Sequence, residues 1–113
     1  MIRKKYCVDG AWLESKTEKW MPVTDSSTGA VIAEVPSCTQ DEVLAAIDAA
    51  DRAFSTWSQM SLSKRTQLLF HWRNVLMEHL EELTLLCARE LGKTLNEARG
   101  DVLKAIEPTE LAC

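Results

Sequence analysis

Strand signals and helix signals occupy separate parts of this chain, and their order limits the folds that it can adopt. Turn residues and short apolar runs are found in residues 1–36, whereas helix caps and helical apolar spacing are found in residues 37–113. A doubly wound nucleotide-binding sheet needs parallel strands joined by crossover helices, and no such unit is visible here. We expect an α+β segment with a β-hairpin region over 1–36 and a helical region over 37–113.

Two short hairpins are predicted in the first region. Asp9-Gly10 lies between the apolar runs 6–8 and 11–13, and this pair readily supplies the positive φ angles of a two-residue type I′ turn. A second hairpin is predicted from strands at 20–24 and 30–35, with a turn cluster at 26–29 and Pro36 as the stop. Hairpins of this size are only marginally stable alone.

Three or four helices are predicted after residue 36. Capping boxes at 39–42 and 94–97 predict two helix starts, and a further helix is predicted from Ser61 onwards. Gly92 is suited to end the helix before it, because glycine adopts the left-handed conformation without a Cβ penalty. Glu81-Glu82 either interrupts that long helical stretch or lies inside it, and Pro108 is expected to break or kink the last helix.

Each predicted helix has one apolar side. The positions expected to face inwards are Val43, Ile47, Ala50, Phe54 and Trp57, then Leu68, Leu69, Trp72, Val75, Leu76 and Leu80, and finally Leu95, Ala98, Val102 and Ile106. The four tryptophans are also expected to pack. Such helices and two hairpins have more apolar faces than they can hide without a sheet to lie on.

Charge and hydropathy exclude several classes of partner. The net charge is −4, and the only basic run, Arg3-Lys4-Lys5, is short, so neither nucleic acid nor an anionic membrane surface is an expected partner. The apolar runs are too short for a transmembrane helix or a secretory signal. We expect a cytoplasmic protein, or a protein of the mitochondrial matrix in a eukaryote.

No catalytic or cofactor-binding residue is predicted in the chain. The cysteines are widely spaced and have no metal-ligand pattern, so Cys7 and Cys87 are expected to be buried thiols rather than nucleophiles. His71 and His79 are about 12 Å apart along a helix axis, too far to share one metal ion. Residues 92–94 copy only the tail of a phosphate-binding loop, since Cys87 stands where its first glycine belongs.

Several segments in the correct order resemble the front of the aldehyde dehydrogenases. Residues 90–98 resemble the family's Glu-x-Gly-Lys-Thr-x-x-x-Ala signature, residues 28–32 its Thr-Gly-x-Val-Ile element, and residues 49–57 its Ala-Ala-x-x-Ala-Phe-x-x-Trp helix. Residues 6–12 are similar to its first hairpin. The segments 14–16, 19–20, 100–102 and 112–113 look most like the branch that oxidises methylmalonate semialdehyde and passes the acyl group to coenzyme A.

The resemblance implies the amino-terminal portion of a longer enzyme, within an α/β NAD-binding domain. The family attacks an aldehyde with a cysteine thiolate, passes a hydride to NAD(P) and releases a thioester to water or coenzyme A. Its nucleophile, oxyanion-stabilising asparagine and glutamate base belong to later segments, so this chain alone should be non-catalytic. The full-length protein should bind NAD, oxidise malonate or methylmalonate semialdehyde to an acyl-coenzyme A, and form a homo-oligomer.

Three charged residues beside the signature have two interpretations each. Glu90 and Lys93 are expected to cap and pin the helix junction rather than to act in catalysis. Asp101 resembles an acidic position that helps some family members hold a structural monovalent cation, and otherwise it is a solvated helix charge. The alternative function class is a small helical module without enzymatic activity that binds a protein partner through its apolar faces.

Overall fold

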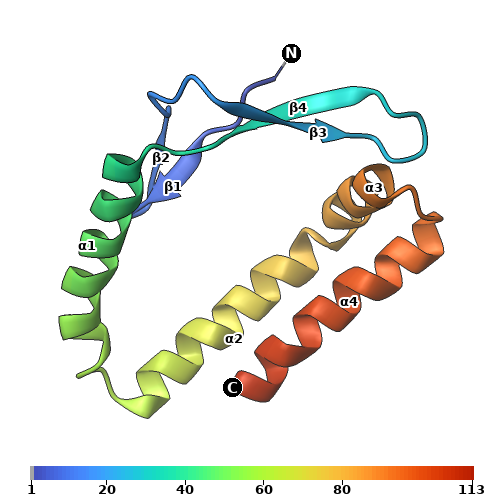
Figure 1. Cartoon of the computed structure of the whole chain (residues 1–113). Coiled ribbons are helices and arrows are strands. Elements are labelled where there is room, and N and C mark those ends of the chain that lie inside the picture. The colour runs from blue at the N-terminus through green and yellow to red at the C-terminus, as the bar shows by residue number, and fades with distance from the viewer. Residues whose placement is uncertain (1) are drawn as a thin grey trace. The chain divides into compact units, whose positions relative to one another are not determined.

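The computed structural model describes residues 2–113, and over that range four strands are followed by four helices (Figure 1). β1 (Tyr6–Val8) pairs with β2 (Ala11–Leu13), and β3 (Trp20–Thr24) pairs with β4 (Val31–Pro36), both antiparallel. The helices are α1 (Gln40–Trp57), α2 (Leu62–Glu78), α3 (Leu80–Leu91) and α4 (Leu95–Ala112). The predicted α+β order of hairpins and then helices is confirmed.

The first hairpin turns as its sequence predicts. Val8 pairs with Ala11, which leaves Asp9 and Gly10 as a two-residue loop. Their φ angles are 52° and 73°, both positive, as a type I′ turn requires. The local dipeptide therefore fixes the register of β1 and β2.

A segment before β1 extends the second sheet. The Lys4 amide donates to the Glu34 carbonyl at 2.8 Å, and the Glu34 amide donates to the Ile2 carbonyl at 2.9 Å. The Arg3 guanidinium lies 4.5 Å from the centre of the Trp20 ring and pairs with the Glu34 carboxylate at 3.2 Å. These bonds pair the backbone amide and carbonyl of Glu34 at one edge of β4, and nothing in the local sequence pattern predicts them.

The contacts divide the chain into two compact units. One unit comprises both hairpins and α1, with the described residues up to Thr24 and Gly29–Gln59. The other comprises α2, α3 and α4 together with Asp25–Thr28, the turn between β3 and β4. The helix α1 is thus grouped with the strands that precede it.

In the first unit, α1 begins at the predicted capping box. The Thr39 hydroxyl accepts the Glu42 amide, and the Glu42 carboxylate accepts the Thr39 amide at 2.8 Å. That carboxylate also accepts the Lys16 amide and the Ser15 hydroxyl, each at 2.7 Å. Glu42 therefore ties the loop between the hairpins to the start of α1.

In the second unit, the long helical stretch is interrupted at His79. α2 ends at Glu78 and α3 begins at Leu80, so the interruption comes just before Glu81-Glu82. Ion pairs join the helices: Arg73 of α2 to Glu110 of α4 at 2.8 Å, and Arg99 of α4 to Glu81 of α3. The three helices thus form one packed group.

The structure differs from the sequence expectations at two positions of α4. Pro108 does not break the helix, which continues to Ala112, because a proline removes a single amide donor; a kink at Pro108 stays a prediction. Leu95 is 56% exposed, whereas Ala98 and Ile106 are buried as predicted. Leu95 opens α4 at the corner where α3 has already ended, so α3 offers no residue to cover it.

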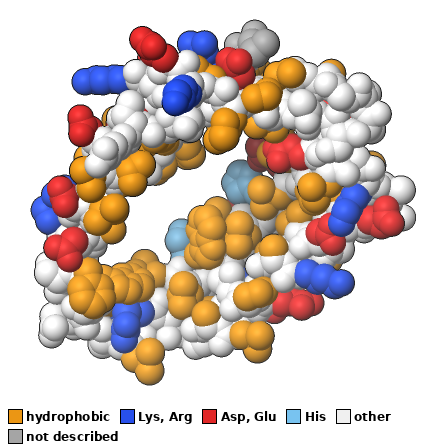
Figure 2. Space-filling view, viewed as in Figure 1, with side chains coloured by type: hydrophobic (Ala, Val, Ile, Leu, Met, Phe, Trp, Pro, Cys, Tyr) orange, Lys and Arg blue, Asp and Glu red, His pale blue; other side chains and the backbone are white. Residues whose placement is uncertain are grey.

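The described residues bury little apolar surface. The buried hydrophobic side chains are Ala33, Leu80, Ala98 and Ile106. Figure 2 shows hydrophobic side chains gathered along α1 and α2 on the viewed face. The large exposed ones on these two helices are Val43, Leu44, Ile47, Phe54, Trp57, Leu62, Leu68, Phe70 and Trp72.

The tryptophans illustrate this exposure. Trp12 is 69% exposed and Trp72 is 54% exposed, so the expectation that they pack is wrong within the described part of the chain. Trp12 lies on a two-stranded sheet. So small a sheet has no further strand to pack against an aromatic ring on its open face. Exposed apolar side chains gathered on one face of a protein mark an interaction surface, a ligand groove or a face prone to aggregate.

Candidate functional site: the α3–α4 corner

The signature residues form the corner between α3 and α4. Gly92 ends α3 in the left-handed conformation, with φ 65° and ψ 30°. The Lys93 amide donates to the Ala88 carbonyl at 3.2 Å, as expected for a helix that ends on a left-handed glycine. The Thr94 hydroxyl then accepts the Glu97 amide while the Glu97 carboxylate accepts the Thr94 amide at 3.2 Å. Both the helix stop and the second capping box are confirmed.

The turn Asp25–Thr28 contacts this corner within the same unit. The Ser26 hydroxyl donates to the Glu90 carbonyl, one of the carbonyls at the end of α3 that lack an intrahelical donor. Arg89 lies 3.8 Å from the Asp25 carboxylate. Sequence reasoning missed these contacts because 64 residues separate the first pair, and no local pattern reports a partner so distant.

Asp25 organises the turn itself. Its carboxylate accepts the Ser27 hydroxyl at 2.5 Å, the Ser27 amide at 2.9 Å and the Thr28 amide at 3.2 Å. Hydrogen bonds from Ser27, chiefly from its hydroxyl, hold the pKa of Asp25 below its ordinary range. The turn is therefore pre-shaped by its first residue and presents Ser26 to α3.

Gly92 meets two demands at once. Its φ angle is one that residues with a Cβ rarely adopt, and a Cβ there would lie 3.3 Å from both the Ser26 Cβ and the Ser27 amide nitrogen. Gly100, inside α4, is a natural contrast, since a Cβ there would meet nothing within 4 Å. The two glycines should respond to alanine in opposite directions.

We expect Gly92→Ala to lower the free energy of unfolding by about 1–3 kcal/mol, because strain in the left-handed region adds to the close approach of the turn. The matched change Gly100→Ala should raise it by about 0.5–1 kcal/mol, because alanine favours the helix interior. Urea unfolding followed by far-ultraviolet circular dichroism measures both. Equal and small effects of the two variants would contradict the close contact at Gly92.

Lys93 and Asp101 form an ion pair across the corner. The Lys93 ammonium donates to the Asp101 carboxylate, and this bond raises the pKa of Lys93. The expectation that Lys93 pins the helix junction agrees with this contact. Within residues 2–113 no cluster of three or more His, Cys, Asp or Glu side chains could hold a metal ion. The side-chain ammonium group of Lys93 thus already neutralises the Asp101 carboxylate. A structural monovalent cation at Asp101 stays a prediction.

The hydrogen-bonded carboxylates make stability sensitive to acid. Donors from Thr94 hold the pKa of Glu97 below its ordinary range, and the Lys16 amide, with further donors, does the same for Glu42. When the folded-state pKa of a carboxyl group is below its unfolded value, the group stabilises the fold at every pH above the unfolded pKa. This contribution to the free energy of unfolding is lost as the pH falls through the folded-state pKa. The pKa of Lys93 is shifted upwards instead, so its contribution to the free energy of unfolding is lost as the pH rises through its folded-state pKa.

We therefore expect the free energy of unfolding to be level near neutral pH and to decline below about pH 4, where these carboxylates take up protons. Urea unfolding at a series of pH values measures the decline. Glu97→Gln should make the acid limb shallower, because glutamine does not titrate. An acid limb of unchanged steepness in that variant would contradict the role of the Glu97 charge.

The cysteines differ in exposure. Cys7 is exposed, so the expectation of burial is wrong for it, because β1 belongs to a two-stranded sheet whose open face has little cover. Cys87 and Cys38 are partly exposed, and Cys113 donates its thiol to the Thr109 carbonyl at 3.2 Å. His79, between α2 and α3, contacts the Glu82 carboxylate at 3.0 Å, and both side chains are exposed.

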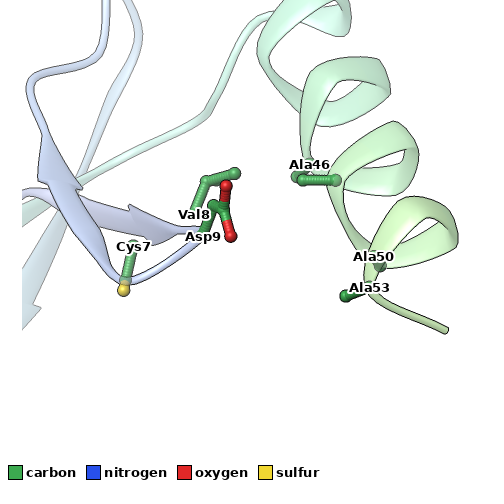
Figure 3. Close-up of a pocket in the computed structure, with 7 residues that line it drawn as sticks. Cys7, Val8, Asp9, Ala46, Ala50 and Ala53 are labelled. Carbon is green, nitrogen blue, oxygen red and sulfur yellow. The ribbon is translucent and has the colours of Figure 1, made fainter. Parts of the chain in front are cut away.

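A pocket of about 230 Å³ lies between the β1–β2 hairpin and α1, inside the first unit (Figure 3). Its lining from α1 consists of alanines, and its lining from the hairpin is Cys7, Val8 and Asp9. In Figure 3 the Val8 side chain points towards α1, whereas the Cys7 side chain does not. Successive side chains of a strand point to opposite sides, so the Cys7 thiol and the Val8 side chain are separated, and the lining of the pocket includes no histidine.

The comparisons with known proteins agree with the resemblance seen in the sequence. Residues 12–113 match the aldehyde dehydrogenase family. The chain is 43% identical over 112 residues to the malonate-semialdehyde dehydrogenase of Listeria monocytogenes strain HCC23, covering 98% of this chain and 23% of that protein. It is 38% identical over 109 residues to the probable methylmalonate-semialdehyde/malonate-semialdehyde dehydrogenase (acylating), mitochondrial, of Aedes aegypti, covering 96% and 21%.

The fold has a counterpart among solved structures. The crystal structure of a putative methylmalonate-semialdehyde dehydrogenase from Sinorhizobium meliloti, complexed with NAD, superimposes with a TM-score of 0.92 and 23% identity. The superposition covers 98% of this chain and 23% of that chain. At this identity the likeness concerns the fold alone.

The chain belongs to the aldehyde dehydrogenase family. It is similar to malonate-semialdehyde and methylmalonate-semialdehyde dehydrogenases, and it spans less than a quarter of the length of these relatives. No helix within residues 2–113 has the length and apolar character needed to cross a bilayer.

Proposed function

We propose that these residues are the amino-terminal segment of an NAD-dependent dehydrogenase that oxidises malonate or methylmalonate semialdehyde to an acyl-coenzyme A. The support is the similarity of nearly the whole chain to proteins with those names, at 43% and 38% identity. In the overall reaction the aldehyde carbon loses a hydride to NAD, and the thiol of coenzyme A takes its place as a thioester with release of a proton.

We propose an architectural role for this segment, with the catalytic and coenzyme-binding groups on other polypeptide of the same protein. Among the described residues, Cys7 and Cys87 line pockets whose lining includes a carboxylate, Asp9 and Glu90 respectively, but no histidine that would activate the thiol. The polar groups of the α3–α4 corner are engaged with each other in caps and ion pairs. The corner fixes a helix junction rather than a reacting group.

Both regions of the chain, 1–36 and 37–113, would then be part of one coenzyme-binding domain in the full-length protein. The same proposal includes NAD as the coenzyme, coenzyme A as the acyl acceptor, a homo-oligomeric assembly, and a cytoplasmic or mitochondrial matrix location. The printed name of the Aedes aegypti relative places that protein in the mitochondrion.

The single observation that carries the proposal is the match of nearly the whole chain to this enzyme family, and the apolar surface that the chain leaves uncovered agrees with it. Phe54 is 63% exposed and Ile47 is 57% exposed on a helix that is amphipathic in sequence. A free-standing module that binds a protein partner would also expose such a face. The match of residues 12–113 to an enzyme family favours the enzyme segment over the module.

The test is to express the complete open reading frame that encodes these residues and to supply malonate semialdehyde, NAD and coenzyme A. We expect NADH absorbance to rise with acyl-coenzyme A formed in equal amount, and the yield of thioester to require coenzyme A. A protein that forms neither NADH nor thioester from either semialdehyde would contradict the proposed activity.

A further inference from the structure

A pocket of about 310 Å³ in the first unit is lined mainly by cationic side chains. Its lining residues are Arg3, Lys4, Lys5, Glu14, Ser15 and Trp20. Three positive side chains and one negative side chain give this lining a net charge of +2, in a chain whose net charge is −4. A positively charged hollow attracts and concentrates anions. This surface is called the Arg3–Trp20 pocket below.

Backbone pairing holds the three cations together. The Lys4 amide donates to the Glu34 carbonyl at 2.8 Å, and the Glu34 amide donates to the Ile2 carbonyl at 2.9 Å. Residues 2–4 therefore run along the edge of β4, and the charged side chains follow one another on an ordered segment. An anion that binds here meets a backbone that is already fixed, which lowers the entropy cost of binding.

Arg3 is oriented by two contacts that leave most of its donors available. Its Nε donates to the Glu34 carboxylate at 3.2 Å, and its guanidinium lies over the Trp20 ring, 4.5 Å from the ring centre. The Trp20 ring is itself held, because its Nε1 donates to the Thr17 carbonyl at 3.2 Å. The terminal nitrogens of a guanidinium carry most of its donors and form the fork that fits phosphate oxygens.

The two lysines are also accessible to an anion. The Lys5 ammonium lies 3.5 Å from the Glu14 carboxylate, and these side chains are 50% and 83% exposed. An exposed ion pair of this kind contributes little, so an incoming anion competes effectively for Lys5. Lys4 forms no salt bridge with any residue in the range 2–113.

The charge and size of the pocket select the class of anion. A net charge of +2 is matched better by a diphosphate group than by a single carboxylate, which carries only one negative charge. One guanidinium and two ammonium groups are typical partners of phosphate oxygens. A volume of about 310 Å³ lies at the lower end of the range of about 300–1,000 Å³ that small-molecule sites occupy.

We propose that the Arg3–Trp20 pocket binds the diphosphate group of a small molecule, with Arg3, Lys4 and Lys5 as its cationic partners. Inorganic pyrophosphate and a nucleoside diphosphate both carry this group. The inference goes beyond the proposed function, because it depends only on the charges and the geometry of the first unit.

Isothermal titration calorimetry tests the proposal on the complete protein whose open reading frame encodes these residues. The probes are inorganic pyrophosphate and ADP, and NAD is present in excess so that the coenzyme site of the proposed dehydrogenase is filled. We expect saturable binding of pyrophosphate with a dissociation constant below about 1 mM at low salt, weakened by added salt. No detectable binding of pyrophosphate at low salt would overturn the proposal.

Two lysines give a matched pair of variants. Lys4 lines the pocket, whereas Lys64 is exposed near the start of α2 and does not line it. Lys4→Gln removes one contacting charge but keeps the backbone amide that pairs with Glu34, so it should weaken pyrophosphate binding by at least about tenfold. Lys64→Gln should weaken it by less than about twofold. Equal weakening by the two variants would indicate the diffuse field of the whole protein and overturn the proposal.

The ADP titration identifies the source of the diphosphate group. ADP binding that Lys4→Gln weakens by about tenfold would assign a nucleotide to the pocket, and pyrophosphate binding alone with this sensitivity would assign free diphosphate. The titrations need no turnover, so their outcome is separate from that of the proposed dehydrogenase activity. Formation of NADH by a protein that binds no pyrophosphate would uphold that activity and reject the anion site.

Discussion

The purified 113-residue chain should form no NADH from malonate semialdehyde, NAD and coenzyme A. A chimera in which this chain replaces the matching 112 residues of the Listeria monocytogenes malonate-semialdehyde dehydrogenase should be active within about tenfold of its parent. Enzymes of this kind accelerate reactions by about 10⁶-fold or more, so the difference between chain and chimera should be of that order. The reason is that the segment supplies helices and a turn-bound corner, and a nucleophile with its base must come from elsewhere. Absorbance of NADH measures both proteins.

The control for this comparison is the chimera carrying Gly92→Ala. That change strains the α3–α4 corner without touching a reacting group, so it should lower the temperature of half-inactivation while leaving the initial rate at low temperature close to that of the unmodified chimera. If the 113-residue chain alone formed NADH, and this activity stayed with the chain through further purification, the architectural role would be contradicted.

Phe54→Ala should have a small effect in the 113-residue chain and a large one in the chimera. Phe54 is 63% exposed, and substitutions at such a site usually change the free energy of unfolding by less than about 0.5 kcal/mol. If the rest of the protein covers α1, the same truncation empties a packed site and should cost about 3–5 kcal/mol. Urea unfolding of the four proteins measures the two differences.

Asp51→Ala is the matched change on the same helix. Asp51 is exposed, so its replacement should alter stability by less than about 0.5 kcal/mol in chain and chimera alike. An equally small effect of Phe54→Ala in both proteins would mean that the apolar side of α1 stays in solvent, and it would favour a surface for a separate protein partner.

Local signals in the sequence predicted local structure well. The Asp9-Gly10 turn, the capping boxes at Thr39 and Thr94 and the left-handed Gly92 all appear where the sequence places them. Each depends on residues only a few positions apart, whose backbone angles and side-chain hydrogen bonds are decided among themselves. The order of hairpins and helices follows directly from these stops and starts.

Contacts between distant residues were not predictable in the same way. The bridge from residues 2–4 to Glu34 and the bond from Ser26 to the Glu90 carbonyl join segments that share no sequence pattern. Burial was also hard to predict. Helical spacing identifies the apolar side of a helix, but it does not indicate whether this chain contains the residues that pack on that side. Leu95 has the expected spacing and is exposed, whereas Ala98 three residues later is fully buried.

The candidate site was predictable in part. The prediction that Lys93 pins the corner came from its place beside a helix stop, and the structure pairs it with Asp101. Asp25 and Ser26 were seen only as turn residues, since their second role depends on the tertiary approach of the turn to α3. The sequence therefore identified the corner but not the turn that contacts it.

The central claim is that the apolar faces of this chain are made to be covered by the rest of a larger protein. Binding of the dye ANS, measured together with sedimentation, tests it most directly on the 12.7 kDa chain and on the chimera. We expect strong dye fluorescence and self-association for the chain, and little of either for the chimera. A chain that sediments as a monomer and binds almost no dye would contradict the account.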